Sequence, residues 1–74
     1  MILFKGMQFT SSTFSMTAEV FEVREEQNQV DVLLIPSDGH QWVERSWNLK
    51  HVLSAFDKGV YVEYDKNQEI NFGI

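Results

Sequence analysis

The chain of 74 residues has no cysteine, only one proline and no long hydrophobic run. Without cysteine it can form neither a disulfide nor a thiolate zinc site, so a hydrophobic core alone must stabilise it. No stretch approaches the roughly 20 apolar residues of a membrane helix. The apolar start at Met1–Phe4 is too short for a secretory signal. We therefore expect one domain over residues 1–74, in a cytoplasmic protein of bacterial or phage origin.

Basic residues are also few. Six Lys and Arg side chains stand against eleven Asp and Glu, which gives a net charge of −5. The imbalance is greatest in residues 18–31, where Arg24 is the only basic residue among five acidic ones. Nucleic acids are bound by clustered basic side chains that displace counterions. A continuous basic groove is therefore not expected.

The residues that catalysis requires are sparse. A metal site needs three or four ligands that converge, and the spacing of residues around the two histidines, His40 and His51, does not predict one. Ser46 and Ser54 lack the pattern of a nucleophile with its base. The four glycines are scattered and form no phosphate-binding loop. We expect no enzymatic activity, no cofactor and no metal.

One segment has a helical period. Leu49, Val52, Leu53 and Phe56 recur at intervals of three and four residues and would line one face. Asn48 is a suitable N-cap and Gly59 a suitable left-handed terminator. The pattern predicts a helix over residues 48–57.

The rest of the chain has the patterns of strands joined by turns. The predicted strands cover residues 7–9, 18–24, 30–35, 40–45 and 60–64, with a loop over 10–17 and an edge strand in the tail 70–74. The alternation of the second strand slips, which predicts a β-bulge between Val20 and Phe21. Asn28 is suited to a left-handed turn. The predicted core is Val20, Val23, Val30, Val32, Leu34, Leu49, Val52, Leu53, Phe56, Val60 and Val62.

This order of elements predicts a mainly β fold, a small antiparallel barrel of five or six strands with one short helix before the penultimate or last strand. The start Gly6-Met7-Gln8-Phe9, the polar loop 10–17, the meander 18–45 and the helix and strand of 49–64 resemble a Src-homology-3-like small barrel. The resemblance concerns architecture and transfers no functional residue. Barrels of this kind bind peptides, nucleic acids or other domains, and the fold alone does not decide among them.

The favoured function is a non-catalytic protein-interaction module, because aromatic residues with polar neighbours commonly anchor interfaces. Phe14, Trp42 and Trp47 are the candidate anchors, with Lys50 and His51 beside them. The alternative is a single-stranded nucleic-acid binder. Its contact residues would be Trp42, Trp47, Arg45 and Lys50.

Each aromatic anchor also has a structural interpretation. Trp42 and Trp47 would then be core residues or lids, although Trp42 and Val43 cannot both face inward in a regular strand. Phe14 would plug an open end of the barrel. The alternating tail 70–74 would pair either within one molecule or with a second copy, in a symmetric homodimer.

Overall fold

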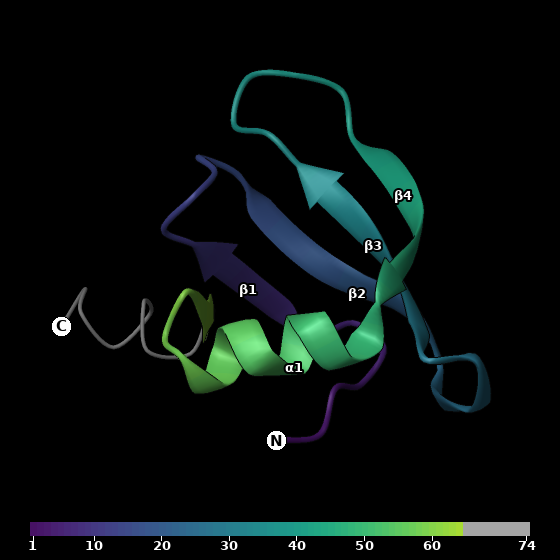
Figure 1. The fold of residues 1–74 in the computed structure, drawn as a ribbon. Helices are drawn as coiled ribbons and strands as arrows, with labels where there is room; N and C mark the ends of the chain where they lie inside the picture. Colours follow the sequence, from purple (N-terminus) through teal and green to yellow (C-terminus); the bar gives the residue numbers. More distant parts are fainter. Residues whose placement is uncertain (65–74) are drawn as a thin grey trace, which may run out of the picture.

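The alternating segments form one antiparallel sheet in a computed structural model that describes residues 1–64 (Figure 1). The elements in chain order are β1 (Gln8–Ser11), β2 (Thr17–Arg24), a 3-10 turn (Glu25–Gln27), β3 (Gln29–Ile35), β4 (Trp42–Asn48), α1 (Leu49–Asp57) and β5 (Tyr61–Glu63). The spatial order of the strands is β4-β3-β2-β1-β5. The prediction of a mainly β fold with one helix before the last strand is confirmed. Among the described residues the sheet does not close into a barrel, and β4 and β5 are its edges.

The predicted helix is confirmed together with its capping residues. The side chain of Asn48 accepts a hydrogen bond from the backbone amide of His51, which satisfies one of the unpaired donors at the helix start. Gly59 has a φ of +77°, the left-handed conformation expected just after the helix. Asn28 is left-handed too, with a φ of 54°. The helix lies across one end of the sheet, and we call the sheet face that it covers the inner face (Figure 1).

The core lies on the inner face and differs in part from the prediction. Its buried residues are Leu3, Met7, Phe9, Ala18, Val20, Val30, Val32, Leu34, Leu49 and Val52. Of the predicted members, Val23, Leu53 and Phe56 are half-buried against this cluster, and Val60 is half-buried too. The prediction for Val62 is wrong, because its side chain is 56% exposed.

The reason for this error is the role of β5 as a short edge strand. Successive side chains of a strand point to opposite faces, so only one of Tyr61 and Val62 can face the core. Tyr61 takes that place, with its ring centroid 5.1 Å from that of Phe9 and 5.6 Å from that of Phe56. The aromatic ring therefore fills the space that the prediction assigned to valine.

Two β-bulges interrupt the sheet on either side of β3. The register between β2 and β3 shifts between Val20 and Glu22, which confirms the predicted bulge at Phe21. A second shift on the other side of β3, between Val30 and Val32, leaves Arg45 and Ser46 of β4 opposite Asp31. Ser46 has a φ of 64°. The predicted strand over 40–45 is thus moved toward the helix, since β4 runs as far as Asn48.

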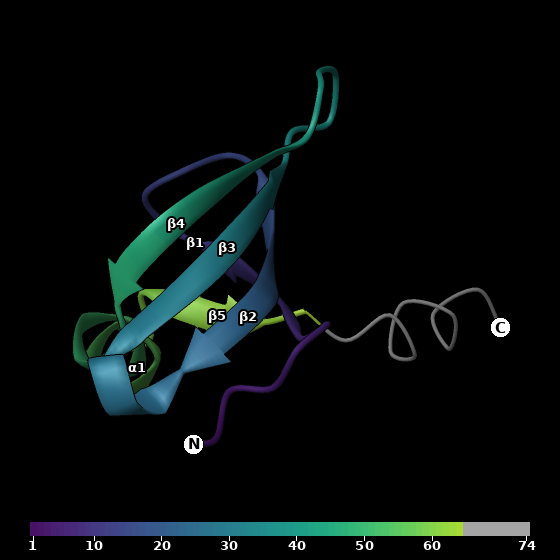
Figure 2. The same cartoon turned by 90° about the vertical axis from the view of Figure 1, so that its right-hand side faces the viewer.

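The β3–β4 hairpin is the longest projection of the described chain, and its connecting loop extends beyond the rest of the sheet (Figure 2). No helix in the described part of the chain has the length and apolar character needed to cross a membrane. The predicted edge strand over 70–74, and the dimer that it would form, lie outside the described residues.

Candidate functional site

The inner face changes character where it reaches the edge strand β4. Residues paired across antiparallel strands share a face, so the register defines three rows that cross the sheet. On β1, β2 and β3 these rows consist of core residues, but on β4 they end in Trp42, Glu44 and Trp47. The complete rows are Phe9–Ala18–Leu34–Trp42, Val20–Val32–Glu44 and Val23–Val30–Trp47. We call these three β4 residues the Trp–Glu–Trp cluster.

Hydrogen bonds hold the cluster together. The indole Nε1–H of Trp42 donates to Glu44 Oε2 at 3.2 Å, and the indole Nε1–H of Trp47 donates to Glu44 Oε1 at 3.1 Å. One carboxylate thus binds both tryptophans of the chain, one through each oxygen. Because a hydrogen bond to an ionised acceptor is stronger than one between neutral groups, Glu44 helps to fix the orientation of both rings.

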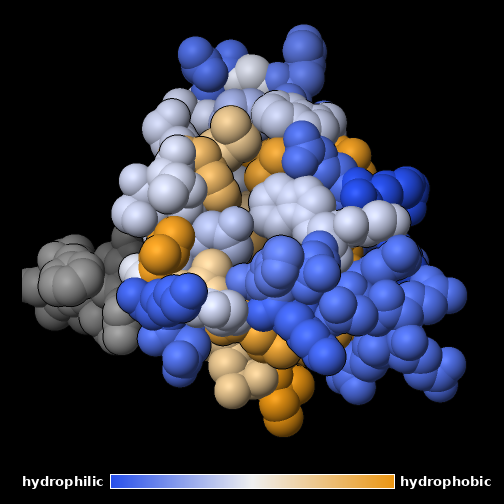
Figure 3. All heavy atoms as spheres, in the orientation of Figure 1, coloured by the Kyte–Doolittle hydropathy of each residue, from blue (hydrophilic) through white to orange (hydrophobic). Residues whose placement is uncertain are grey.

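Neither tryptophan is a core residue. Trp42 is 42% exposed, while Trp47 is half-buried and packs against the core. The expectation that Trp42 and Val43 face opposite ways is confirmed, since Trp42 pairs with the buried Leu34 and Val43 with Leu33. In Figure 3 the centre of the inner face carries apolar and near-neutral side chains, bordered by hydrophilic ones on the β4 side. Trp42 thus extends the row of the buried Leu34 to the partly exposed sheet edge.

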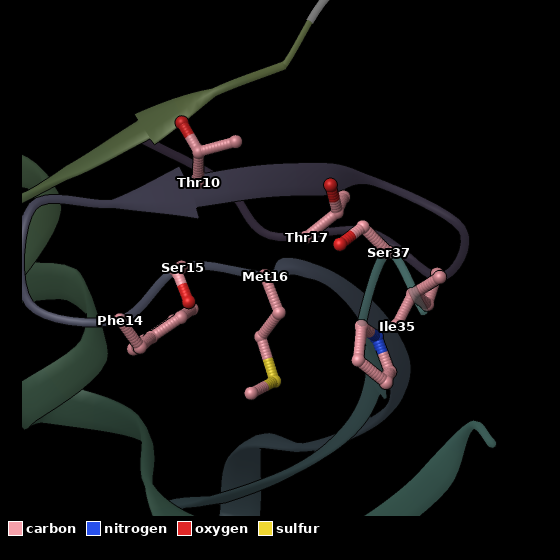
Figure 4. A pocket seen from close by; sticks show the side chains of 8 residues that line it. Thr10, Phe14, Ser15, Met16, Thr17, Ile35 and Ser37 are labelled. Carbon is pink, nitrogen blue, oxygen red and sulfur yellow. The ribbon is translucent and has the colours of Figure 1, made fainter. Parts of the chain in front are cut away.

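Phe14 lies elsewhere, in the loop between β1 and β2. It is half-buried against the core, with its ring centroid 5.9 Å from that of Tyr61. Phe14 and Met16 line a cavity of about 390 Å³ that is also bordered by the end of β3 and the start of the β3–β4 turn (Figure 4). This position fits a packing role for Phe14 better than a role as an exposed residue that contacts a partner.

The cationic residues predicted beside the tryptophans do not converge on them. Arg45 lies opposite Asp31 at the second bulge, and its Nη1 is 3.2 Å from Asp31 Oδ2. Lys50 lines a different cavity, of about 470 Å³, with Leu53 and the N-terminal residues. His51 is exposed on the first turn of α1. The predicted site therefore contains two aromatic rings and an acid, without a basic cluster.

Two acidic residues with defined hydrogen-bond partners, Glu44 and Asp31, were not predicted from the sequence. Asp31 is fully buried on the face of β3 opposite that of Val30 and Val32. Arg24 binds it through two contacts, Nη1 to Oδ2 at 2.6 Å and Nη2 to Oδ1 at 2.8 Å, and the amide of Ser46 donates to Oδ1 at 2.9 Å. The signal in the sequence was an aspartate inside an otherwise apolar strand, between residues of a sheet interior.

These contacts stabilise the charged form of Asp31. Hydrogen bonds from Arg24 and Ser46 hold the pKa of this carboxyl well below its usual range, and the same contact raises the pKa of Arg24. Because Asp31 faces both bulges, the network of Asp31, Arg24, Arg45 and Ser46 fastens three strands at the point where their pairing is irregular. We call it the Asp31 network.

Among residues 1–64 no group of three or more His, Asp or Glu side chains is arranged to hold a metal ion. No protein-family model, no curated protein and no solved structure matches this chain. The Trp–Glu–Trp cluster is the candidate functional site that its own geometry identifies.

Proposed function

We propose that the protein is a non-catalytic protein-interaction module and that the Trp–Glu–Trp cluster is its contact surface. The observation that carries the proposal is the pair of indole rings held by one carboxylate on β4, a strand at the edge of the sheet formed by residues 1–64. Large aromatic residues are the commonest anchors of protein interfaces. Rings that are already oriented lose little conformational freedom on binding, which favours affinity.

The resemblance to Src-homology-3-like barrels belongs to this proposal. It is supported by the element order, in which a strand and a loop precede a three-stranded meander and a helix precedes β5. The cluster differs from a simple apolar groove, because a charged residue lies between its two rings. Contact with a protein partner would cover the exposed part of Trp42 and the edge of β4 that no strand of the described residues pairs with.

The rival function is binding of single-stranded nucleic acid, for which two stacking rings are also suitable. The carboxylate of Glu44 counts against it, since it would face the phosphate groups of a strand lying on the rings. Arg45, which the rival interpretation needs, is bound to Asp31 instead.

The proposal is tested by selecting peptides from a random display library on the full chain. We expect enriched peptides whose binding to Trp42→Ala is at least tenfold weaker. Phe4→Ala is the matched control, because it also removes an exposed aromatic ring, 54% exposed, but outside the cluster. A selection that yields no binder, or binders insensitive to Trp42→Ala, would contradict the proposal.

The rival is tested by titrating the protein with single-stranded DNA and RNA at low and moderate salt. Binding that weakens with salt and is lost in Trp47→Ala and Lys50→Ala would replace the protein-interaction proposal with the nucleic-acid one. We expect no such binding.

A further inference from the structure

Hydrogen bonds fix the carboxylate of Glu44 in position, but no cationic side chain of the described residues forms a salt bridge with it. Both of its hydrogen-bond donors are uncharged indole groups. Within residues 1–64 the salt bridges join Arg24 to Glu22 and Asp31, and Arg45 to Asp31, so none involves Glu44. The site therefore presents a full negative charge between two aromatic rings, in a fixed arrangement.

We propose that the Trp–Glu–Trp cluster binds the cationic side chain of a lysine or arginine on a partner protein. This inference rests on the proposed function and specifies the chemistry of the partner. The face of an indole attracts cations more strongly than that of any other aromatic side chain. The carboxylate adds a charge-assisted hydrogen bond from the same ligand group.

The cost of removing Glu44 from water also favours a cationic partner. An interface that covered Glu44 with apolar groups would remove a charge from water without compensation, which strongly opposes binding. A phosphate would add repulsion to the same cost. Among partners that cover Glu44, one that brings a positive group to the carboxylate therefore compensates this cost best.

The charge of the whole chain supports the same occupant. With a net charge of −5, the protein attracts basic segments during diffusional encounter and repels acidic ones. The N–H groups of both indoles are committed to Glu44, so the cation would contact the exposed ring surface, of which Trp42, 42% exposed, offers the most.

The test uses the two tryptophans as their own reporters. Because the chain contains only Trp42 and Trp47, a spectrum of the ¹⁵N-labelled full-length protein shows two indole N–H signals. The probe is an acetylated and amidated Gly-Gly-Arg-Gly-Gly peptide. Its control replaces arginine by citrulline, which has nearly the same shape but no charge.

We expect the arginine peptide to shift both indole signals saturably and the citrulline peptide to bind at least about fivefold more weakly. Glu44→Gln should weaken binding of the arginine peptide to a similar extent. Glu63→Gln, which removes an exposed carboxylate on β5, should leave it unchanged. The backbone amide signals of each variant report whether it is folded.

Equal binding of the two peptides to the unchanged protein would overturn the inference, whatever the variants do. Undiminished binding to folded Glu44→Gln would overturn it as well. Failure of the inference is distinguishable from failure of the proposed function. If library peptides bind through Trp42 but carry neither lysine nor arginine, the interaction module stands and the cation site does not.

Discussion

Two carboxylates on neighbouring strands, Asp31 of β3 and Glu44 of β4, each accept several hydrogen bonds, but only the charge of Asp31 is compensated by cations. Asp31 is fully buried and bound by two guanidinium groups and a backbone amide. Glu44 is exposed and bound by two indole N–H groups. The first arrangement neutralises a charge inside the sheet, while the second leaves a charge available at its edge.

The difference lies in the donors: charged guanidinium groups give a carboxylate a structural role, whereas neutral indole groups leave its charge available for binding. A buried carboxylate that lost its cationic partners would remain as an uncompensated charge, so the Asp31 network and the fold depend on each other. An exposed carboxylate keeps its hydration, so its loss costs the fold little. We therefore expect substitutions at the two positions to separate stability from binding.

The largest effect is expected for Asp31→Asn. The variant removes the charge that Arg24 and Arg45 bind. Because both guanidinium groups reach water, the cost is that of the lost charge-assisted hydrogen bonds, about 2–3 kcal/mol. The free energy of unfolding is measured with urea, with tryptophan fluorescence as the signal. A protein of this size has a stability of only about 5–10 kcal/mol, so this loss is a large fraction of the total. A loss below about 1 kcal/mol would show that the network does not support the sheet.

A smaller effect is expected from acid. In the folded state the pKa of Asp31 is held low, whereas in the unfolded chain it returns to about 3.9. The unfolded state then binds more protons below about pH 4, so this contribution to stability is complete above about pH 5 and decreases as the pH falls. We expect a loss of about 2 kcal/mol between pH 5 and pH 2.

This pH dependence is checked by urea unfolding at several pH values and by ¹³C NMR of the side-chain carboxyl groups. The carboxyl signal of Asp31 should keep the chemical shift of its ionised form at pH 3. Titration of that signal near pH 4 would mean that Arg24 and Ser46 do not stabilise the charge, contrary to the contacts in the structure.

The smallest effect on stability is expected for Glu44→Gln, a change below about 1 kcal/mol. The amide oxygen can still accept one indole hydrogen bond, and the site is exposed to water. Urea unfolding gives the stability, and the chemical shifts of the two indole N–H groups should both change. A loss above about 2 kcal/mol would make Glu44 a structural residue like Asp31 and remove the contrast between them.

The local elements could be predicted because short-range patterns specify them. The helix follows from the spacing of Leu49, Val52 and Phe56 and from the capping residue Asn48. The bulge at Phe21 follows from the slip in alternation. The errors concern positions that depend on distant partners. Phe9 is buried because Phe56 and Tyr61 surround it, which nothing in its own short strand indicates.

The candidate site, too, contains residues that the sequence indicates and residues that only the strand register identifies. Trp42 and Trp47 were predicted as contact residues from their chemistry, and that function stays a prediction. Glu44 was not singled out, because a glutamate in a mixed strand is ordinary until the register places it between two indoles. The contact of Arg45 with Asp31 could not be predicted either, since it depends on the second bulge, which places Arg45 opposite Asp31.

The sequence by itself determined a small mainly β chain with one capped helix, because hydrophobic periodicity and capping act over a few residues. Tertiary structure decided which strand lies at the edge, which aromatic rings are buried and which acidic residues meet cations. These outcomes depend on strand register, and a shift of one residue exchanges the two faces of a sheet.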